Sequence, residues 1–228
     1  MLVTGFPAGP PGTNCWVVAP AAGERCVVVD PGIGALDPLE RVLDRHRLRP
    51  AAVLLTHGHL DHTFSVVPVC EATDIPAYLH AADRPQLTDP WTWTGIPRGM
   101  PVLGLASLPA AEPADLRPLA DGDTLELAGV RLGVRHAPGH TLGSVVFTLD
   151  TPDAPVLLSG DLLFAGSIGR VDLPGGSEAA MLDSLARVVL PLDDATVVHP
   201  GHGPSTTVGR ERLANPFLQL VIEKESLS

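Results

Sequence analysis

Short apolar runs alternate with helix-like stretches along the whole chain. Runs rich in Val, Ile and Leu predict buried strands, because branched side chains favour extended backbone. The predicted strands cover residues 14–19, 26–30, 51–55, 75–79, 124–127, 130–136, 145–149, 156–158 and 196–198. Helices are predicted to begin near Asp37, Phe64 and Ser177, and the tail after Val208 is predicted to be helical. The alternation of strands and helices predicts a single α/β domain over residues 1–228.

Two of the predicted helices begin with capping sequences. Asp37 precedes Pro38, and Glu40 lies three residues after Asp37, which is a common helix start. Ser177 is predicted to cap the other helix. The residues that form one apolar face of this second helix are Met181, Leu182, Leu185 and Val189.

Residues 84–120 differ from the rest of the chain because seven prolines interrupt them. Proline removes a backbone donor and fixes φ, so no regular element is predicted here. Trp91 and Trp93 lie in the same stretch. Long irregular segments in compact domains commonly serve as lids or binding loops. We therefore predict a loop on the substrate side, with an inert surface excursion as the alternative.

Side chains with metal-binding chemistry follow the apolar run 51–55. The segment reads Thr56-His57-Gly58-His59-Leu60-Asp61-His62. His57 and His59 are two residues apart, so in extended backbone they point the same way. Imidazole and carboxylate groups at this spacing are typical of zinc or iron sites, whereas an ordinary polar loop needs no such group of histidines. The segment therefore predicts a metal site at a strand end.

Three further strand ends carry candidate ligands. His136 belongs to its strand, whereas His140 follows a Pro-Gly turn, so only His140 is a good candidate. His199 and His202 are related in the same way, and His202 is the candidate of that pair. Asp161 follows the strand at 156–158. Because the carboxyl ends of strands are the usual position of sites in α/β proteins, we expect these groups to meet.

A third acid, Asp30, follows three valines at another strand end. It has two possible roles that the sequence does not separate. It could cap the Pro-Gly turn that follows it, or it could support a ligand histidine by a hydrogen bond.

The composition limits the possible partners and compartment. The chain has 228 residues, 45% of them hydrophobic, and a formal net charge of −11. This acidic balance argues against nucleic acid or an anionic membrane as the main partner. No transmembrane run or signal peptide is evident, and three cysteines are too few for a disulfide framework, so we expect a cytoplasmic protein. The sequence leaves the oligomeric state open.

The series of candidate ligands resembles that of the metallo-β-lactamase superfamily, over essentially the whole chain. The series is His57-x-His59-x-Asp61-His62, then His140, Asp161 and His202. The resemblance implies an α/β fold, the four-layer αβ/βα metallo-β-lactamase sandwich, with the metals at the edge between two sheets.

The resemblance also implies how the ligands divide. One metal would be held by His57, His59 and His140. The other would be held by Asp61, His62 and His202, and Asp161 would bridge both. The expected cofactors are two divalent metal ions, with zinc first and iron or manganese as the other candidates.

Within the superfamily, the chain most resembles bacterial glyoxalase II-like proteins, the hydroxyacylglutathione hydrolases. The matching segments are the loop at 166–172, the Leu-Pro-Gly-Gly sequence at 173–176 and the tail at 208–218. True β-lactamases generally lack the bridging acid, and flavodiiron members place an acid where His59 stands. The glycine-rich loop lacks the lysine and tyrosine of the better-known glyoxalase II pattern, so the thiol carrier stays open.

The implied reaction is hydrolysis of a thioester of a low-molecular-weight thiol. Zinc coordination lowers the pKa of water from about 15.7 to about 7, so hydroxide becomes available at neutral pH. The hydroxide would attack the thioester carbonyl, metal charge would stabilise the oxyanion, and a thiolate would leave. Asp61 would orient the hydroxide as well as bind metal. Candidate carboxylate-binding groups for a small anionic thioester substrate are Arg170, Arg210 and Arg212.

Two other functions are open at this point. A persulfide dioxygenase shares the histidine motif and would use one iron held by His57, His140 and Asp161. The Pro-Gly-Gly loop favours the hydrolase over this alternative. A non-enzymatic metal-binding protein is the third possibility, and the intact ligand set for two metals argues against it.

Overall fold

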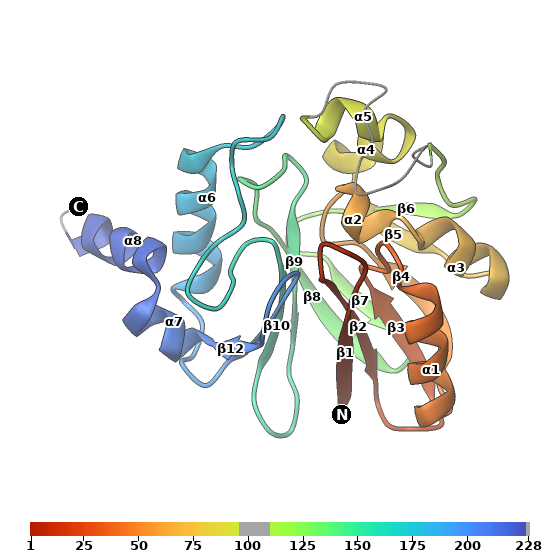
Figure 1. Ribbon diagram of the computed structural model, residues 1–228. Coiled ribbons are helices and arrows are strands. Elements are labelled where there is room, and N and C mark those ends of the chain that lie inside the picture. The colour runs from red at the N-terminus through yellow and green to blue at the C-terminus, as the bar shows by residue number, and fades with distance from the viewer. Residues whose placement is uncertain (96–109, 227–228) are drawn as a thin grey trace.

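Two six-stranded sheets face each other in the computed structural model, which describes residues 1–95 and 110–226 (Figure 1). The first sheet follows chain order and contains β1 (Leu2–Ala8), β2 (Thr13–Ala19), β3 (Arg25–Val29), β4 (Arg49–Leu54), β5 (Ala77–His80) and β6 (Leu116–Leu119). The second runs in reverse order and contains β7 (Thr124–Leu127), β8 (Val130–His136), β9 (Val145–Leu149), β10 (Val156–Gly160), β11 (Val197–Pro200) and β12 (Thr206–Thr207).

Both sheets mix parallel and antiparallel pairing. Strands β1, β2 and β3 pair antiparallel, and β3 to β6 then continue in parallel. In the second sheet, β7 to β10 pair antiparallel, and β11 adds to β10 in parallel. Strands β4, β8, β10 and β11 consequently end at the same end of the sandwich, where the predicted ligands follow.

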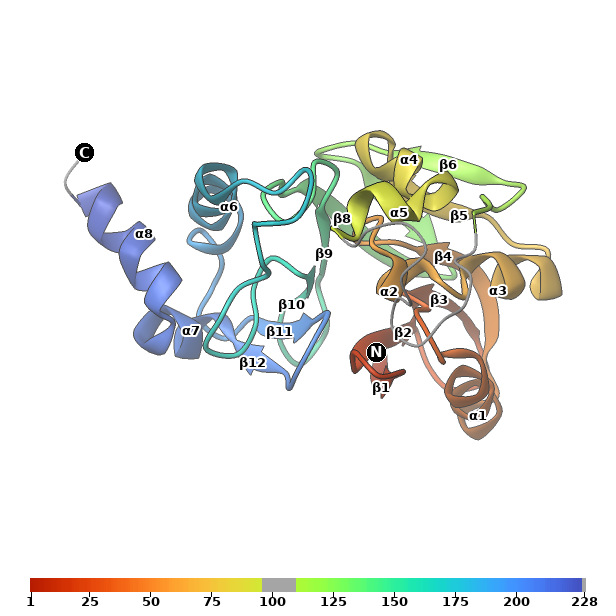
Figure 2. The same ribbon diagram turned by 45° about the horizontal axis from the view of Figure 1, so that its top comes forward.

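Helices cover the outer faces of the two sheets (Figures 1 and 2). On the first sheet lie α1 (Leu36–His46) and α3 (Val66–Thr73), and on the second lie α6 (Glu178–Ser184), α7 (Val208–Ala214) and α8 (Pro216–Ser226). Shorter elements are α2 (Leu60–Thr63), η1 (Ala81–Asp83), α4 (Arg84–Thr88), α5 (Pro90–Trp93) and the π-helical turn η2 (Leu185–Val189). This arrangement is the predicted four-layer αβ/βα sandwich.

Successive residues of one strand pack into different hydrophobic cores, one between the sheets and one beneath the helices. In β4, Val53 packs towards α1 and α3, whereas Ala52 and Leu54 face the other sheet. In β9, Phe147 lies between the sheets and Val146 packs against α6 and α8. Because successive strand residues point to opposite faces, a strand buried on both faces needs an unbroken apolar run. This requirement explains the apolar runs from which the strands were predicted.

The predicted helix starts have different outcomes. Ser177 caps α6, since its hydroxyl accepts a hydrogen bond from the Ala180 amide at 3.3 Å. Asp37 lies inside α1, whose cap position is Ala35 and has no side-chain cap bond. The expectation that Asp37 caps this helix is therefore wrong. The helix starts two residues earlier, and its backbone is not capped by a side chain.

The prediction that residues 84–120 contain no regular element is also wrong in part. Helices α4 and α5 begin with Pro85 at the second position and Pro90 at the first, where the missing N–H has no helical partner to lose. Strand β6 lies at the sheet edge and tolerates Pro118 there. The remainder of this stretch, 96–109, lies outside the described residues.

The three cysteines Cys15, Cys26 and Cys70 are buried and unpaired. Burial raises the pKa of the Cys26 thiol to about 12, so it stays protonated at neutral pH. Within the described ranges, no helix has the length and apolar character needed to cross a membrane.

Candidate metal centre

The loops at one end of the sandwich bring all seven predicted ligands together. His57 and His59 lie between β4 and α2, and Asp61 and His62 lie in the first turn of α2. The remaining three come from loops of the second sheet, after β8, β10 and β11, and are His140, Asp161 and His202. The two sheets therefore contribute separate parts of one centre.

The seven residues form three overlapping groups whose ligand atoms lie within 4.8 Å of one another. The groups are His57–His59–His140, His57–His62–Asp161 and Asp61–His62–His202. His57 and His62 each belong to two groups, so the three groups form one continuous cluster. The outer two are the triads that the family resemblance implied for two metals.

In two of the histidines, a hydrogen bond at Nδ1 shows which ring nitrogen carries the proton. His57 Nδ1 lies 3.0 Å from Thr56 Oγ1, whose own proton goes to Asp30 at 2.6 Å, so the histidine donates. His140 Nδ1 donates to the Arg170 carbonyl at 2.7 Å. In both rings Nε2 is left with a lone pair, which is the tautomer that a metal ligand needs. The lone pair of His57 has no partner, and that of His140 lies 2.8 Å from His59 Nδ1.

Asp30 supports the cluster through hydrogen bonds to Thr56 and His62. One carboxylate oxygen accepts from the Thr56 amide at 2.8 Å, and the other accepts from Thr56 Oγ1 and lies 3.0 Å from His62 Nδ1. His62 thus donates from Nδ1 and directs Nε2 towards Asp61 and Asp161. Of the two roles left open for Asp30, support of a ligand histidine is the one that the structure shows.

The unsatisfied atoms of the cluster fit a bound cation. Among the described residues, His57 Nε2, His59 Nε2 and Asp161 Oδ1 are buried without a hydrogen-bond partner. His62 Nε2 lies 3.4 Å from Asp161 Oδ1 and 3.6 Å from Asp61 Oδ2. Lone pairs and carboxylates facing one another in a buried site are costly unless a positive charge lies among them. Nitrogen and carboxylate donors of this kind suit zinc, iron or manganese.

The electrostatics of the cluster agree with that requirement. Burial, reinforced by the neighbouring histidines, lowers the pKa of His57 well below its usual value, and burial lowers that of His59 to about 3. Burial alone would lower the pKa of His62, but Asp161, Asp61 and Asp30 outweigh it and raise the value to about 10. His62 and the hydrogen bond from His202 likewise overcome burial and hold the pKa of Asp61 well below its usual range. The acids thus favour a cation beside them.

Close approach of backbone to the ligands requires glycine at Gly201. A Cβ there would collide with Asp161 Oδ1 and would lie 2.7 Å from His62 Cε1. The same turn is tied to the first sheet, since Asn14 Nδ2 and Trp16 Nε1 each donate to the Pro200 carbonyl at 3.0 Å. These bonds position the His202 loop against the His57–His62 segment.

A pocket of about 410 Å³ opens over the cluster. Five of the predicted ligands contribute to its lining, namely His59, Asp61, His140, Asp161 and His202. Its walls also include Trp93 and Thr94, in keeping with the expected substrate-side position of the early part of 84–120. Trp91, from the same helix, is not part of the lining. The volume suits a small-molecule substrate.

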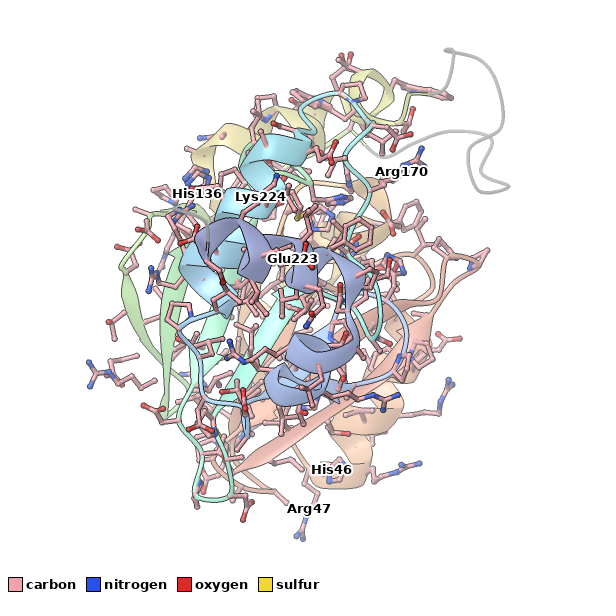
Figure 3. The ribbon with its side chains drawn as sticks, turned by 90° about the vertical axis from the view of Figure 1, so that its left-hand side faces the viewer. His46, Arg47, His136, Arg170, Glu223 and Lys224 are labelled. Carbon is pink, nitrogen blue, oxygen red and sulfur yellow. The ribbon has the colours of Figure 1, made fainter. Side chains whose placement is uncertain are left out.

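The three predicted substrate-binding arginines are not brought together. Arg170 lines the pocket and extends outward from its loop, well separated from His136 (Figure 3). Arg210 is exposed and Arg212 binds Asp194 and the carbonyls of Leu190 and Leu192. Neither of these two lines the pocket, because α7 lies on the outer face of the second sheet. Their placement does not support a direct role in binding.

The excluded histidines have other partners. His136 Nε2 donates to the Leu142 carbonyl at 2.9 Å, and its ring stacks on His80. His199 packs on Trp16 with ring centroids 4.2 Å apart and contacts Ser205 through Nδ1. Neither belongs to the ligand groups found among the described residues.

Sequence reasoning missed several residues that shape the centre. Asp83 is fully buried and accepts from the Gly58 amide, the Thr141 hydroxyl and the Gly143 amide at 2.9, 2.6 and 2.7 Å. It thereby joins the His59 loop to the His140 loop. Thr13 donates to Asp61 Oδ2 at 2.9 Å. Asp83 and Thr13 are 48 to 60 residues from these partners in the sequence, except that Gly58 is 25 residues from Asp83. No local sequence pattern therefore points to either residue.

Relatives match the chain over nearly its full length. A protein of Mycobacterium tuberculosis is 48% identical over 227 residues, 96% of this chain and 98% of that protein. The probable metallo-hydrolase YqgX of Bacillus subtilis is 37% identical over 214 residues, 93% of this chain and 95% of YqgX. The hydroxyacylglutathione hydrolase GloC of Haemophilus influenzae is 31% identical over 195 residues, 86% of this chain and 88% of GloC.

Solved structures show the same architecture. The BLEG-1 B3 metallo-beta-lactamase has a TM-score of 0.84 at 39% identity, over 95% of this chain and 99% of that chain. TTHA1623 in a di-iron-bound form has a TM-score of 0.76 at 38% identity, over 94% of this chain and 100% of that chain. A model of the Metallo-beta-lactamase superfamily matches residues 8–202, which include every ligand of the cluster. The chain therefore belongs to the metallo-beta-lactamase superfamily.

Proposed function

We propose that this protein is a metal-dependent hydrolase that cleaves thioesters of a low-molecular-weight thiol. The observation that carries the proposal is the buried cluster of seven ligand side chains, with unpartnered nitrogen and oxygen atoms, beneath a pocket of substrate size. The similarity to GloC supports a thioester as the bond that is cleaved. The probable metallo-hydrolase YqgX supports the wider reaction class.

Two metal ions would be held by the two outer groups of the cluster. His57, His59 and His140 would hold one, and Asp61, His62 and His202 the other. Asp161 would serve both, since its Oδ1 lies 3.4 Å from His62 Nε2 and its Oδ2 lies 3.4 Å from His140 Nε2. The bound ions would polarise the thioester carbonyl and lower the pKa of water. The ligand types suit zinc, and the di-iron form of TTHA1623 supports iron as a further candidate.

Asp61 would orient the attacking water. Thr13 fixes one carboxylate oxygen, and the lowered pKa keeps the group ionised, so it can accept a hydrogen bond from water. The water oxygen adds to the carbonyl carbon, the C–S bond breaks, and the water proton passes to the departing sulfur. The products are a carboxylic acid and a free thiol. No serine or cysteine nucleophile is needed.

The test combines metal analysis with turnover. Protein purified without added metal is analysed for zinc, iron and manganese, and is then offered a hydroxyacyl thioester without air, a β-lactam, and a low-molecular-weight persulfide under air. We expect thiol release from the thioester, abolished in His140→Ala and retained in His136→Ala. The β-lactam arm is included because BLEG-1 is named a B3 metallo-beta-lactamase.

Three results would overturn the proposal. Hydrolysis of the β-lactam without thiol release from any thioester would make the protein a β-lactamase. Oxygen consumption with the persulfide alone would make it a dioxygenase. Full metal content and turnover in His140→Ala would refute the assignment of the centre.

A further inference from the structure

Apart from the five predicted ligands, the residues that line the pocket above the cluster are mainly apolar. The apolar lining residues are Pro11, Leu60, Pro90, Trp93, Phe164 and Leu173. They come from both halves of the sandwich. Apolar surface of this kind favours an apolar substrate group, because contact with it removes that group from water.

Trp93 brings the two walls close together. Its indole lies against the glycine-rich loop, since a Cβ on Gly175 would be 3.2 Å from Trp93 Cζ3. Beside it, a Cβ on Gly95 would be 3.1 Å from Leu173 Cδ2. Helix α5 and the loop before α6 therefore approach each other over the cluster, at the upper end of the sandwich in Figure 1. The indole and Leu173 thus both lie where the two walls of the pocket meet.

The positive charge at the pocket rim is already paired with a carboxylate. Arg170 is the only Arg or Lys among the lining residues that the structure describes. Its guanidinium makes a bidentate pair with Asp172, at 2.7 and 2.8 Å, and its side chain is 60% exposed. An anionic substrate group would have to compete with that carboxylate, in a protein of net charge −11. The rim therefore offers little to a substrate with carboxylates.

One buried polar group in the pocket wall has no partner. Gln86 is 1% exposed, lines the pocket, and neither its Nε2 nor its Oε1 makes a hydrogen bond within the described chain. Its amide carbon lies over Gly58, whose backbone amide donates to Asp83. An unpaired buried amide is unfavourable, and its last torsion turns easily. A secondary amide offers the N–H and C=O that would satisfy it.

From these observations we infer that the pocket takes a neutral thioester with an apolar acyl group and an amide in its thiol portion. Trp93 and Leu173 pack on the apolar group, and Gln86 pairs with the amide. This inference rests on the proposed thioester hydrolysis and revises the anionic substrate expected from the sequence. It makes Gln86 a substrate-binding residue of the centre.

The experiment compares one apolar acyl group on three thiols. N-acetylcysteamine is neutral and carries an amide, mercaptoethanol is neutral without one, and glutathione carries carboxylates. We expect kcat/KM to be about tenfold higher for the N-acetylcysteamine thioester than for the glutathione thioester. Gln86→Met should raise KM about fivefold for the N-acetylcysteamine thioester and leave the mercaptoethanol thioester unchanged.

Apolar packing is tested with Trp93→Ala in α5 and with Leu173→Ala in the loop before α6. Each should lower kcat/KM about tenfold for a long acyl group and little for acetyl, whereas Trp91→Ala serves as the matched control. Metal content and the unfolding temperature of each variant are measured alongside. The inference would be overturned if the wild type preferred the glutathione thioester, if Arg170→Gln reduced that preference, and if Gln86→Met left it unchanged. Thioester hydrolysis itself would still stand.

Binding supplies a readout that does not depend on turnover. Calorimetric titration uses thioether analogues of the N-acetylcysteamine and glutathione thioesters, which cannot be hydrolysed. We expect the neutral analogue to bind more tightly and to lose about tenfold in affinity in Trp93→Ala. If no thioester is hydrolysed but this pattern holds, the proposed reaction fails and the pocket assignment stands. Equal binding of both analogues in all variants would reject the pocket assignment.

Discussion

At the scale of single residues, the ligand role of each histidine is decided by what binds its other nitrogen. His57, His62 and His140 direct Nδ1 to Thr56, Asp30 and the Arg170 carbonyl, so Nε2 points into the cluster. His202 Nδ1 similarly lies 3.3 Å from the Pro11 carbonyl. A hydrogen bond at one ring nitrogen fixes the orientation of the imidazole and so the direction of the other nitrogen. The chain therefore orients these rings by bonds that do not require an ion.

Asp30 is the residue on which this preparation most depends. In Asp30→Asn the side chain keeps its shape but loses one acceptor oxygen, so it cannot satisfy Thr56 and His62 together. We expect metal affinity to fall about 10–100-fold, as for other residues that support metal ligands. Competition titration against a chromophoric chelator measures this affinity. Asp37→Asn, on the exposed side of α1, is the control, and equal affinities in the two variants would contradict the role of Asp30.

The sequence predicted the ligands because most are local to one segment or follow recognisable turns. His57, His59, Asp61 and His62 lie within six residues, and strand ends marked His140, Asp161 and His202. No local sequence pattern indicated a role for Asp83 or Gln86. Their roles come from contacts with Gly58 and the His140 loop, which only the folded chain brings near them.

At the scale of elements, apolar periodicity predicted the central strands better than the edges. Strand β1 contains Gly5 and Pro7 and lies at a sheet edge, where alternation of apolar residues is not required. Strand β12 has two residues, too few for any pattern. Helices α4 and α5 were missed because Pro85 and Pro90 were read as breaks, although both occupy first-turn positions. The tolerance of a helix start for proline is the physical reason.

Strand β11 is held against β2 by the contact of His199 with Trp16. Burial lowers the pKa of His199 to about 4, below its usual value near 6.5. Between these values the unfolded chain binds a proton that the folded chain does not, so stability is lost as pH falls from about 6.5 to 4. We expect His199→Gln to show a weaker loss of stability over this range. Urea unfolding at several pH values measures it, with His46→Gln as control, and parallel curves for wild type and His199→Gln would contradict it.

At the scale of the whole molecule, the centre joins two halves that have separate helical cores. The first half supplies His57, His59, Asp61 and His62, and the second supplies His140, Asp161 and His202. Between them lies the apolar core shared by the two sheets. A ligand set divided in this way couples the closeness of the sheets to the occupancy of the centre. Anything that binds the folded centre and not the unfolded chain stabilises the whole fold.

Removal of metal should therefore lower the unfolding temperature of the entire molecule in one transition. Ions held at 100 times their dissociation constant contribute about 2.7 kcal/mol, and 1 kcal/mol corresponds to about 2–4 °C in a protein of this size. We expect a decrease of roughly 5–11 °C in scanning calorimetry after dialysis against a chelator. Returning zinc, iron or manganese should restore it, and His140→Ala should start from the lower value and respond little to the chelator. An unchanged transition in protein shown by elemental analysis to have lost its metal would mean that the centre does not link the two sheets.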